Sequence, residues 1–583
     1  MDFFGTTMRD SIVGTVDADV IDVSQGNRDT VDGGDGDDTI LFGTELNDND
    51  QVDGGIGYDV VNLDGNYFGG VTFTPTSMVN VEELFFEGGN SYTLTMDEAT
   101  AAGVTFFYVT AGLLDAGDSL YIDFQAETDV IYDISDGRGN DIFIGGPRGA
   151  NFRLNFGDDT VAGGSGADDF FMGAGLSPGD VLFGGLGTDD LSLGGDYSAG
   201  LVITGTMVSD FETLQITPSA DVNLTLLDDV YAGFLPFRVR VPSFGSSPGH
   251  SIIVDASDEA DSSYNFEGGI SDETFLGGAL GDTFDFATTN GGGQGGVDSV
   301  EGNGGDDVIE FDATFTRDDA IDGGAGFDEI LLTGDYSAGV NFASTTMRDV
   351  EAITLAAGFS YELTVGNNNV QADGFTVDAE ALLSGQTLTY DGGAESLSDV
   401  VLRGGAGGDT LIAGGGDDEL VAHEGADSLV GGDGDDTING AIGRDTISGG
   451  EGTDRLRGGT SPTTFIFTGV SESTGAGRDW LDVIKPLKDI FDLDVAVTGV
   501  DARVNAGTLS EGTFDANLAA AIGAGQLAAG HAVVYHPNAG DLSGGFFLVV
   551  DANGIAGYQA GLDYVMEFAA GSHPNNIAVG MFV

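Results

Sequence analysis

Apolar residues recur every nine positions between residues 403 and 460, and each of them follows an aspartate by two places. The residues in between are rich in glycine and aspartate, which favour turns. A fixed short period of this kind predicts short strands separated by Gly-rich turns, with one apolar side chain per repeat pointing inward. These inward positions are Leu411, Leu420, Leu429, Ile438, Ile447 and Leu456.

The aspartates of these repeats predict a bound cation. They belong to units such as residues 404–411 (GGAGGDTL), 431–438 (GGDGDDTI) and 449–456 (GGEGTDRL). Glycine suits a turn that visits positive φ and brings backbone carbonyls close together, because a Cβ would obstruct it. Inward carbonyls and carboxylates need a cation, and Ca²⁺ accepts about six to eight such oxygens in a flexible geometry.

The GGxGxDxUx unit, in which U is a large apolar residue, resembles the calcium-binding nonapeptide of RTX proteins. Among these the chain is most similar to RTX surface-layer proteins. The resemblance implies a β-roll in which two nonapeptides complete one flattened coil and calcium ions lie between turns on the same edge. Asp409, Asp427 and Asp445 would then share one edge, and Asp418, Asp436 and Asp454 the other. The alternative, a flexible Asp/Gly-rich linker, does not explain a phase that holds over six cycles.

Degenerate arrays of spaced aspartates precede the regular one. Within residues 29–59, 159–189 and 298–328, four aspartates are separated by steps of nine, twelve and nine residues. Chance would not produce the same order of spacings three times. The predicted calcium ligands therefore extend over most of the chain. The complete predicted set is Asp29, Asp38, Asp50, Asp59, Asp159, Asp168, Asp180, Asp189, Asp282, Asp298, Asp307, Asp319, Asp328, Asp409, Asp418, Asp427, Asp436, Asp445 and Asp454.

A longer module follows each degenerate array. It starts with NLDGNYFGGVTF, SLGGDYSAGLVI or LLTGDYSAGVNF and carries a glutamate 23 residues after the last aspartate of the array, at Glu82, Glu212 and Glu351. The modules are poor in the Gly-Gly-Asp signature, so they are either hydrophobic-cored solenoid rungs or small β-sandwich inserts. The glutamates are interpreted as polar residues that close a turn, with a calcium ligand as the alternative.

The last 120 residues differ in character from the repeats. Residues 464–482 and 490–494 resemble the segment that closes the β-roll in serralysin-type RTX proteases and RTX surface proteins, although DWLDVI and DIFDLD match that pattern incompletely. An Ala-rich helix is predicted over residues 515–523, with strands at 531–535 and 546–550. The apolar final segment, ending in MFV, resembles the uncleaved address of type I secretion.

These patterns predict an all-β fold: an elongated parallel β-roll or β-solenoid with three larger inserted modules and a small mixed C-terminal capping and secretion segment. The predicted organisation is a degenerate RTX array at residues 1–60, long-coil module 1 at 61–140, an array at 141–190, module 2 at 191–270, an array at 271–329, module 3 at 330–402, the regular β-roll at 403–460 and the cap at 461–583.

Composition supports a folded chain that needs cations. There are 97 acidic and 17 basic residues, a formal charge of −80, yet 41% of the chain is hydrophobic. Folding such a charge without counterions costs self-repulsion throughout the structure. The charge argues against nucleic acid or anionic lipid as a partner. The chain has no cysteine for disulfides, and no apolar run approaches the length that spans a bilayer, so no membrane insertion is expected.

We find no convincing catalytic motif. His423 and Glu424 lie inside a nonapeptide and lack the second histidine of HExxH. Residues 245–249 (GSSPG) match GxSxG, but the prolines around them favour a loop. Repeats also leave no stretch of domain size for a separate catalytic unit. We therefore expect a protein that is not an enzyme, with an RTX extracellular hydrolase as a less favoured alternative.

The leading hypothesis is a secreted structural protein of the cell surface or extracellular matrix. It would leave the cell through a type I secretion ABC transporter, since the N-terminal residues lack the features of a Sec signal. Calcium outside the cell would drive folding, and copies would associate, with the first coil covered by a neighbour. The alternative is an adhesin that binds cell-surface polysaccharide through exposed aromatic residues. Tyr67, Tyr197 and Tyr336 are the candidates for this role, but core packing is the favoured interpretation of their side chains.

Overall fold

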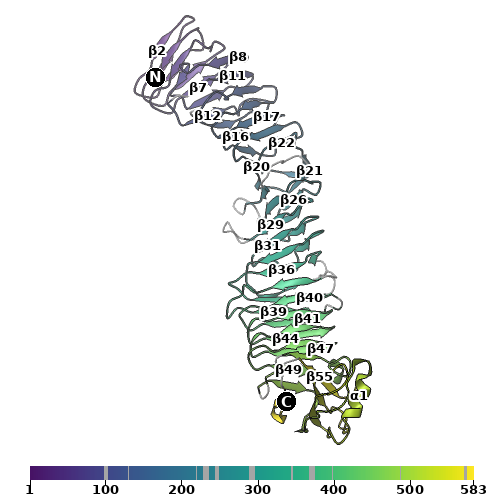
Figure 1. Cartoon of the computed structure of the whole chain (residues 1–583). Helices are drawn as coiled ribbons and strands as arrows, with labels where there is room; N and C mark the ends of the chain where they lie inside the picture. The colour runs from purple at the N-terminus through teal and green to yellow at the C-terminus, as the bar shows by residue number, and fades with distance from the viewer. Residues whose placement is uncertain are drawn as a thin grey trace. The chain divides into compact units, whose positions relative to one another are not determined.

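A computed structural model describes residues 1–97, 103–128, 130–217, 219–227, 236–242, 249–287, 296–342, 346–366, 374–394, 396, 398–482, 484–485, 488–569, 574 and 576–583. The chain divides into two compact units, Met1–Gly305 and Asp306–Val583. Each unit is a stack of short β-strands (Figure 1). In the described residues there is one α-helix, α1 (Phe514–Ala521).

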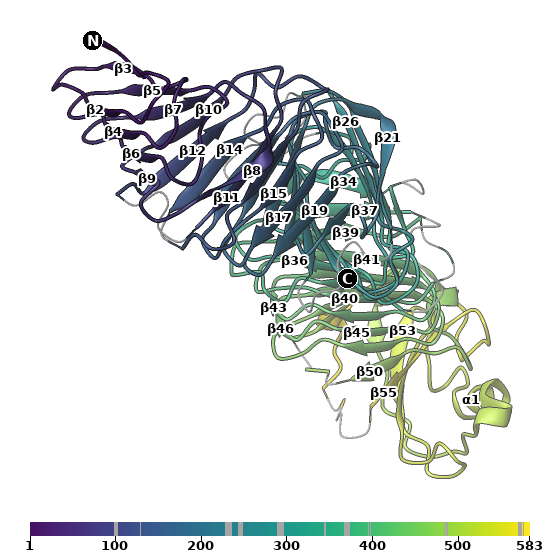
Figure 2. The same cartoon turned by 90° about the horizontal axis from the view of Figure 1, so that it is seen from above.

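Unit 1 is a parallel β-solenoid with two sets of strands. In the first set β1 pairs in parallel with β3, joining Asp2 to Val20 and Phe4 to Asp22, and this pairing continues from coil to coil. Figure 2 shows the strands side by side. The set consists of β1 (Asp2–Phe4), β3 (Val20–Asp22), β5 (Thr39–Phe42), β7 (Val60–Leu63), β10 (Glu83–Phe86), β12 (Phe106–Thr110), β14 (Ile131–Ser135), β16 (Ala150–Leu154), β18 (Asp169–Met172), β20 (Asp190–Gly194), β23 (Thr213–Thr217), β25 (Phe237–Arg240), β27 (Tyr264–Glu267) and β29 (Thr283–Phe286).

The second set of unit 1 alternates with the first along the chain and divides into three parallel sheets. One sheet contains β2 (Ser11–Val13), β4 (Thr30–Asp32), β6 (Gln51–Asp53) and β9 (Met78–Val79). The next contains β8 (Tyr67–Phe73), β11 (Tyr92–Met96), β13 (Leu120–Asp123), β15 (Ile142–Ile144), β17 (Thr160–Gly164), β19 (Val181–Gly185) and β22 (Val208–Ser209). The last contains β21 (Tyr197–Ile203), β24 (Val222–Leu226), β26 (Ser251–Asp255), β28 (Asp272–Leu276) and β30 (Ser299–Glu301).

Unit 2 repeats this architecture. Its first set is β31 (Val308–Phe311), β33 (Glu329–Leu332), β36 (Ala352–Leu355), β38 (Phe375–Asp378), β40 (Val400–Arg403), β42 (Glu419–Val421), β45 (Thr437–Asn439), β48 (Arg455–Arg457) and β50 (Trp480–Asp482). Its second set is β32 (Ala320–Asp322) with β35 (Met347–Arg348), β43 (Glu424–Gly425) with β46 (Ile442–Gly443), and β34 (Tyr336–Phe342), β37 (Tyr361–Val365), β39 (Leu388–Asp391), β41 (Thr410–Gly415), β44 (Ser428–Asp433), β47 (Thr446–Glu451), β49 (Thr464–Phe467) and β51 (Ile490–Leu493).

The core of each solenoid lies between its two sets of strands. Side chains alternate between buried and partly exposed along the strands, as expected for a strand with one face inward. The six apolar positions predicted from the nine-residue period are all at most 1% exposed. Thr410 pairs with Ser428 and Leu411 with Leu429, so one coil of the regular array contains 18 residues. The predicted parallel β-roll is confirmed.

The long modules are solenoid rungs, which decides between the two alternatives left open by the sequence. In the first module β10 pairs in parallel with both β7 and β12, and β11 pairs in parallel with β8 and β13. A bulge interrupts β8, because Tyr67 pairs with Tyr92 but Val71 pairs with Leu94. Gly70, within the bulge, has a φ of +87°, which favours glycine.

The C-terminal cap is a small mixed structure in unit 2. After β52 (Gly499–Val500) the chain forms α1 and an antiparallel sheet of β53 (His531–Tyr535), β54 (Phe546–Val550) and β55 (Tyr564–Phe568). β55 pairs in parallel with β50, which joins the cap to the solenoid. The 3₁₀ turns η1 (Val470–Glu472), η2 (Glu511–Thr513) and η3 (Val579–Met581) complete it. The predicted helix begins one residue earlier than expected, and both predicted strands have their expected bounds.

Candidate metal centres

The aspartates of the regular array form two ladders, one on each edge of the solenoid. Oδ1 of the last four aspartates accepts the backbone N–H of the aspartate one coil earlier, whereas Oδ1 of Asp409 and Asp418 accepts the N–H of Leu388 and Val400. These bonds measure 2.9 Å from Asp418 N to Asp436 and 3.0 Å from Asp436 N to Asp454. On the other edge they measure 2.8 Å from Asp409 N to Asp427 and 3.3 Å from Asp427 N to Asp445. The structure thus groups the six aspartates by edge as the resemblance implies.

The second oxygen of these carboxylates faces the turn. Oδ2 of Asp418, Asp427, Asp436, Asp445 and Asp454 is buried and has no hydrogen-bond partner among the described residues. A buried acceptor without a partner costs free energy, and a buried charge costs more. Each of these oxygens therefore requires a positive partner or a proton.

Backbone carbonyls face the same space. A Cβ on Gly404 would lie 2.5 Å from Asp409 Oδ2 and 2.8 Å from the Ala422 carbonyl oxygen of the next coil. A Cβ on Gly431 would collide with Asp436 Oδ2 and lie 2.7 Å from the Gly449 carbonyl oxygen. Glycine thus keeps open a space that is bounded by carboxylate and carbonyl oxygens. That donor set fits a hard cation such as calcium.

Burial makes these carboxylates costly to ionise without a cation. Desolvation, the largest cause, and the charge of neighbouring aspartates raise the pKa of Asp418 and Asp436 to about 7. Desolvation likewise raises the pKa of Asp454 to about 7 and that of Asp445 to about 6. A divalent cation in the turn removes this penalty because it supplies the missing opposite charge.

The same ladder recurs, in shorter pieces, in the degenerate arrays. Asp38 N–H donates to Asp59 Oδ1 at 2.8 Å, and Asp168 N–H donates to Asp189 Oδ1 at 2.8 Å. Asp29 and Asp298 accept the N–H of Asp10 and Glu273. Asp307 N–H donates to Asp328 Oδ1 at 2.9 Å. Every aspartate of the predicted set is buried. In these arrays Oδ2 lacks a partner among the described residues at Asp38, Asp59, Asp159, Asp168, Asp189 and Asp328.

The aspartate after each twelve-residue step uses its carboxylate differently. Oδ2 of Asp50, Asp180 and Asp319 accepts the N–H of the residue three places earlier, at 2.8, 2.6 and 2.6 Å. These bonds close a local turn and satisfy the oxygen that faces a glycine turn elsewhere. Oδ2 of Asp282 and Asp409 likewise accepts a backbone N–H four places earlier. The geometry therefore favours a cation at Asp38, Asp59, Asp159, Asp168, Asp189, Asp328, Asp418, Asp427, Asp436, Asp445 and Asp454, whose Oδ2 has no partner among the described residues.

The module glutamates extend the ladders. Oε2 of Glu82, Glu212 and Glu351 accepts the N–H of Asp59, Asp189 and Asp328, at 2.7, 2.7 and 2.8 Å. Each glutamate thus takes the place of the next aspartate instead of only closing a turn. Desolvation, followed by the charge of the glutamate, raises the pKa of Asp59, Asp189 and Asp328 to about 6.

Three carboxylates of the site, Asp479, Asp136 and Asp141, are absent from the predicted set of ligands. Asp479 Oδ1 accepts Asp454 N–H at 3.0 Å, and desolvation with the Asp454 charge raises the pKa of Asp479 to about 9. Its spacing of 25 residues from Asp454 falls outside the nine-residue phase. Asp136 replaces the first glycine of its unit (DGRGND) and lies in a buried group with Asp141 and Asp159.

Other predicted features lie away from the ladders. Tyr67, Tyr197 and Tyr336 are at most 7% exposed, which confirms core packing, the favoured interpretation, and removes them as adhesin contacts. The tyrosine at the start of each bulged strand points into the core, and the residues after it face outward. His423 lies in a repeat turn with a φ of +68°. Residues 245–248 lie outside the described residues.

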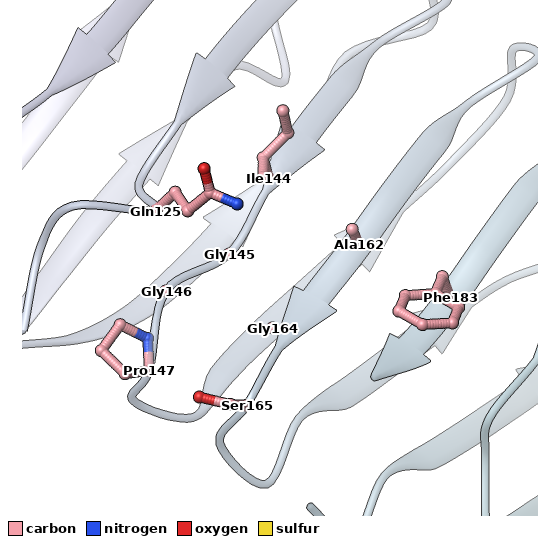
Figure 3. A pocket seen from close by; sticks show the side chains of 9 residues that line it. All are labelled: Gln125, Ile144, Gly145, Gly146, Pro147, Ala162, Gly164, Ser165 and Phe183. Carbon is pink, nitrogen blue, oxygen red and sulfur yellow. The ribbon is translucent and has the colours of Figure 1, made fainter. Parts of the chain in front are cut away.

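Two open cavities lie on the surface of unit 1. One, of about 380 Å³, is lined by residues of β15, β17 and β19 and the turns beside them, including Gln125, Ile144 and Phe183 (Figure 3). The other, of about 280 Å³, is lined by Phe68 and Tyr121 among others. None of the described residues that line either cavity is acidic. Within the part of the chain that the structure describes, no helix has the length and apolar character needed to cross a bilayer.

The fold and the ladders define a parallel β-solenoid whose turns gather carboxylate and carbonyl oxygens for calcium. A family model for the RTX calcium-binding nonapeptide repeat matches the chain in four copies, at residues 4–40, 152–175, 401–429 and 430–460. No protein in the curated set matches the chain. The chain is an RTX repeat protein, and its cofactor is calcium.

Proposed function

We propose that this protein is a secreted, non-enzymatic structural protein that folds on calcium outside the cell and assembles into a surface layer or extracellular matrix. The observation that carries the proposal is the row of buried carboxylate oxygens without hydrogen-bond partners among the described residues, found in both units. The ladders take up most of the repeat arrays, so calcium binding serves the fold itself. Export by a type I ABC transporter fits an RTX chain of this composition.

The chain's own residues supply the folding switch. Bound calcium contributes positive charge at the turns, where the carboxylates otherwise repel one another. Oδ1 of each ladder aspartate holds the amide of the preceding coil, while Oδ2 and the glycine carbonyls face the cation. With a formal charge of −80, the calcium-free chain stays expanded. Extracellular calcium modules bind at about 0.1–1 mM, which matches the outside of a cell.

Circular dichroism of the full chain with millimolar calcium and with excess EGTA tests the folding switch. We expect most of the strand signal to be lost in EGTA and to return when calcium is added back. Small-angle scattering on the same samples should show expansion in EGTA. A strand signal of undiminished size in EGTA would contradict the proposal.

Self-association is the second part of the proposal. β1 and β2 pair on one side only in the described structure, with β3 and β4. Phe4 and Val16, in these first coils, are 73% and 72% exposed. Edge strands with apolar neighbours favour pairing with another chain. We expect particles larger than a monomer in light scattering at millimolar calcium, and Phe4→Ser should reduce their size. A monodisperse monomer under these conditions would contradict assembly.

An adhesin that binds polysaccharide is the second candidate function. Aromatic residues that face outward support it: Phe68 and Phe183 are 73% and 43% exposed, and each lines an open cavity. Aromatic faces on such surfaces can contact sugar rings. Glycan-array binding that is lost in Phe183→Ala, without ordered arrays in electron microscopy, would favour the adhesin. Ordered arrays without glycan binding would favour the structural role.

A further inference from the structure

Three buried carboxylates meet in one turn region of unit 1. One oxygen from each of Asp136, Asp141 and Asp159 lies within 4.8 Å of the others, and all three residues are fully buried. We propose that they form a three-carboxylate calcium site that binds more tightly than the other sites of unit 1 and fills first. The proposal rests on calcium binding by the repeats and does not depend on self-assembly.

Two of the three carboxylates belong to a ladder. Asp141 Oδ1 accepts the Leu120 N–H at 2.7 Å and its Oδ2 accepts the Gly137 N–H at 3.4 Å, while Asp159 Oδ1 accepts the Asp141 N–H at 2.9 Å. Asp159 Oδ2 is buried and has no hydrogen-bond partner among the described residues. The cluster of three carboxylates is one indication of a bound cation, and this unpartnered oxygen is an independent second one, because a buried charged acceptor without a partner is costly.

Asp136 supplies the third carboxylate and comes from outside the ladder. It follows β14 directly, and it occupies the place of the first glycine in the unit DGRGND. Asn155 of the next coil fixes its orientation: Asn155 N–H donates to Oδ2 at 3.1 Å and Asn155 Nδ2 donates to Oδ1 at 2.9 Å. The side chain is therefore held in place before any cation binds.

Charge distinguishes this site from its neighbours. Elsewhere in the regular array this first position is glycine or alanine, which contributes only a carbonyl. Here a third negative group faces the same buried space, and the number of charged ligands is a main determinant of calcium affinity. Without a cation the three carboxylates must share protons or repel one another. A divalent cation at their centre satisfies all three at once.

Early filling of this site would organise the middle of unit 1. Asp136 follows β14, while Asp141 and Asp159 come immediately before β15 and β17. A cation bound by all three would fix the ends of strands from both sets. Phe143 of β15 and Phe152 of β16 are buried in the core of this part of the unit, with their ring centroids 6.3 Å apart. The unit thus gains an ordered coil on which its neighbours can stack.

The first test uses the full chain and calcium alone, titrated in competition with a fluorescent chelator. Asp136→Gly restores the common repeat residue, and Asp136→Asn keeps the shape of the side chain with one charge fewer. Asp158→Asn is the matched control, because it removes one charge from an exposed residue next to Asp159. We expect one tight step in the native chain, weakened at least about tenfold in both Asp136 variants and unchanged in the control.

Two results would overturn the proposal: a tight step that survives both Asp136 substitutions, or a native titration without such a step. Circular dichroism at saturating calcium checks that each variant folds. Hydrogen exchange of the native chain gives a test that needs no variant. Protection of residues 131–160 should reach half its maximum at lower calcium than that of residues 30–60, and coincident midpoints would contradict early filling. These readouts remain informative if self-assembly fails.

Discussion

The regular array and the long modules use the same solenoid but satisfy their turns in different ways. In the regular array the turn oxygens of residues such as Asp436 lack hydrogen-bond donors among the described residues. In the modules tyrosine hydroxyls approach the turn carbonyls. The Tyr92 hydroxyl lies 2.8 Å from the carbonyl oxygens of both Leu63 and Glu87, and Tyr361 has the same arrangement with Leu332 and Ala356.

The comparison shows that one backbone architecture can be held by a metal or by side-chain donors. A tyrosine fills the core with its ring and brings its own donor to the carbonyls. A glycine turn has neither and leaves its oxygens to a cation. The modules should therefore depend less on calcium than the arrays between them. The largest expected effect is that of removing calcium.

Gradual removal of calcium should open the regular array before module 3. Hydrogen exchange over a series of buffered calcium concentrations measures this order by segment. We expect residues 403–460 to lose protection at a higher calcium concentration than residues 330–366, because the turns of the array depend on the ion for a positive partner. Simultaneous loss in both segments would show that the modules have no calcium-independent contribution.

The pH dependence of the calcium-free protein should run opposite to that of the calcium-bound protein. Burial raises the folded-state pKa of Asp418 and Asp436 to about 7, above the unfolded value of about 4. A raised folded pKa contributes stability that is fully present below pH 4 or so and is lost as the pH rises through about 7. Without calcium, the strand signal in circular dichroism should thus be larger at pH 5 than at pH 8.

With calcium the protein should instead be more stable at pH 8 than at pH 5, because protons compete with the ion for the same carboxylates. The control is the set of urea midpoints at saturating calcium and the same two pH values. A calcium-free strand signal that is independent of pH would mean that these aspartates are not buried in the folded chain.

The effect of Asp436→Asn on the stability of the fold should change sign with calcium. The Asn side chain can still accept the Asp418 amide, but it lacks the charge that a cation needs. At saturating calcium we expect a loss of about 1–3 kcal/mol in the free energy of unfolding. Without calcium at pH 8 the variant should keep more strand signal than the native chain, because a buried charge is gone. Urea denaturation measures the first effect and circular dichroism the second. Asp433→Asn, at an exposed position of the same repeat, is the control.

Tyr92→Phe should have the smallest effect, and calcium should not change it. The substitution removes one hydroxyl donor from two buried carbonyls and costs about 1 kcal/mol. Hydrogen exchange of residues 60–96 reports the loss locally. Tyr121→Phe, on the partly exposed side of the neighbouring strand, should leave protection unchanged. If the loss of stability in Tyr92→Phe disappeared in excess calcium, a metal ion would also bind at this turn.

Much of the fold follows from the nine-residue period. Period and resemblance together specify coils of 18 residues, the inward leucines and isoleucines, and the edge to which each aspartate belongs. The cap helix and strands follow from local composition. The modules could not be assigned from sequence, because an alternating strand such as residues 92–96 buries one face equally well in a sandwich or a solenoid.

The site was harder to predict than the fold. Whether a carboxylate oxygen is free for a cation depends on local turns, as at Asp50, whose Oδ2 is taken by the Asn47 amide. Asp136 has no place in the GGxGxD pattern, so only its position beside Asp141 and Asp159 reveals it. Core packing of Tyr67, by contrast, was the favoured interpretation from the sequence, and the structure confirms it.

The ladders give the stack a direction. Each aspartate carboxylate accepts an amide of the coil that precedes it, so for this side-chain acceptor a coil depends on its C-terminal neighbour. The backbone bonds beside the ladder run the other way, as the Thr437 N–H donates to the Asp418 carbonyl of the preceding coil. Asp479, in the segment that leads into the cap, provides the last side-chain acceptor after Asp454. Loss of the segment that contains Asp479 would therefore leave the Asp454 amide of the last coil without its acceptor.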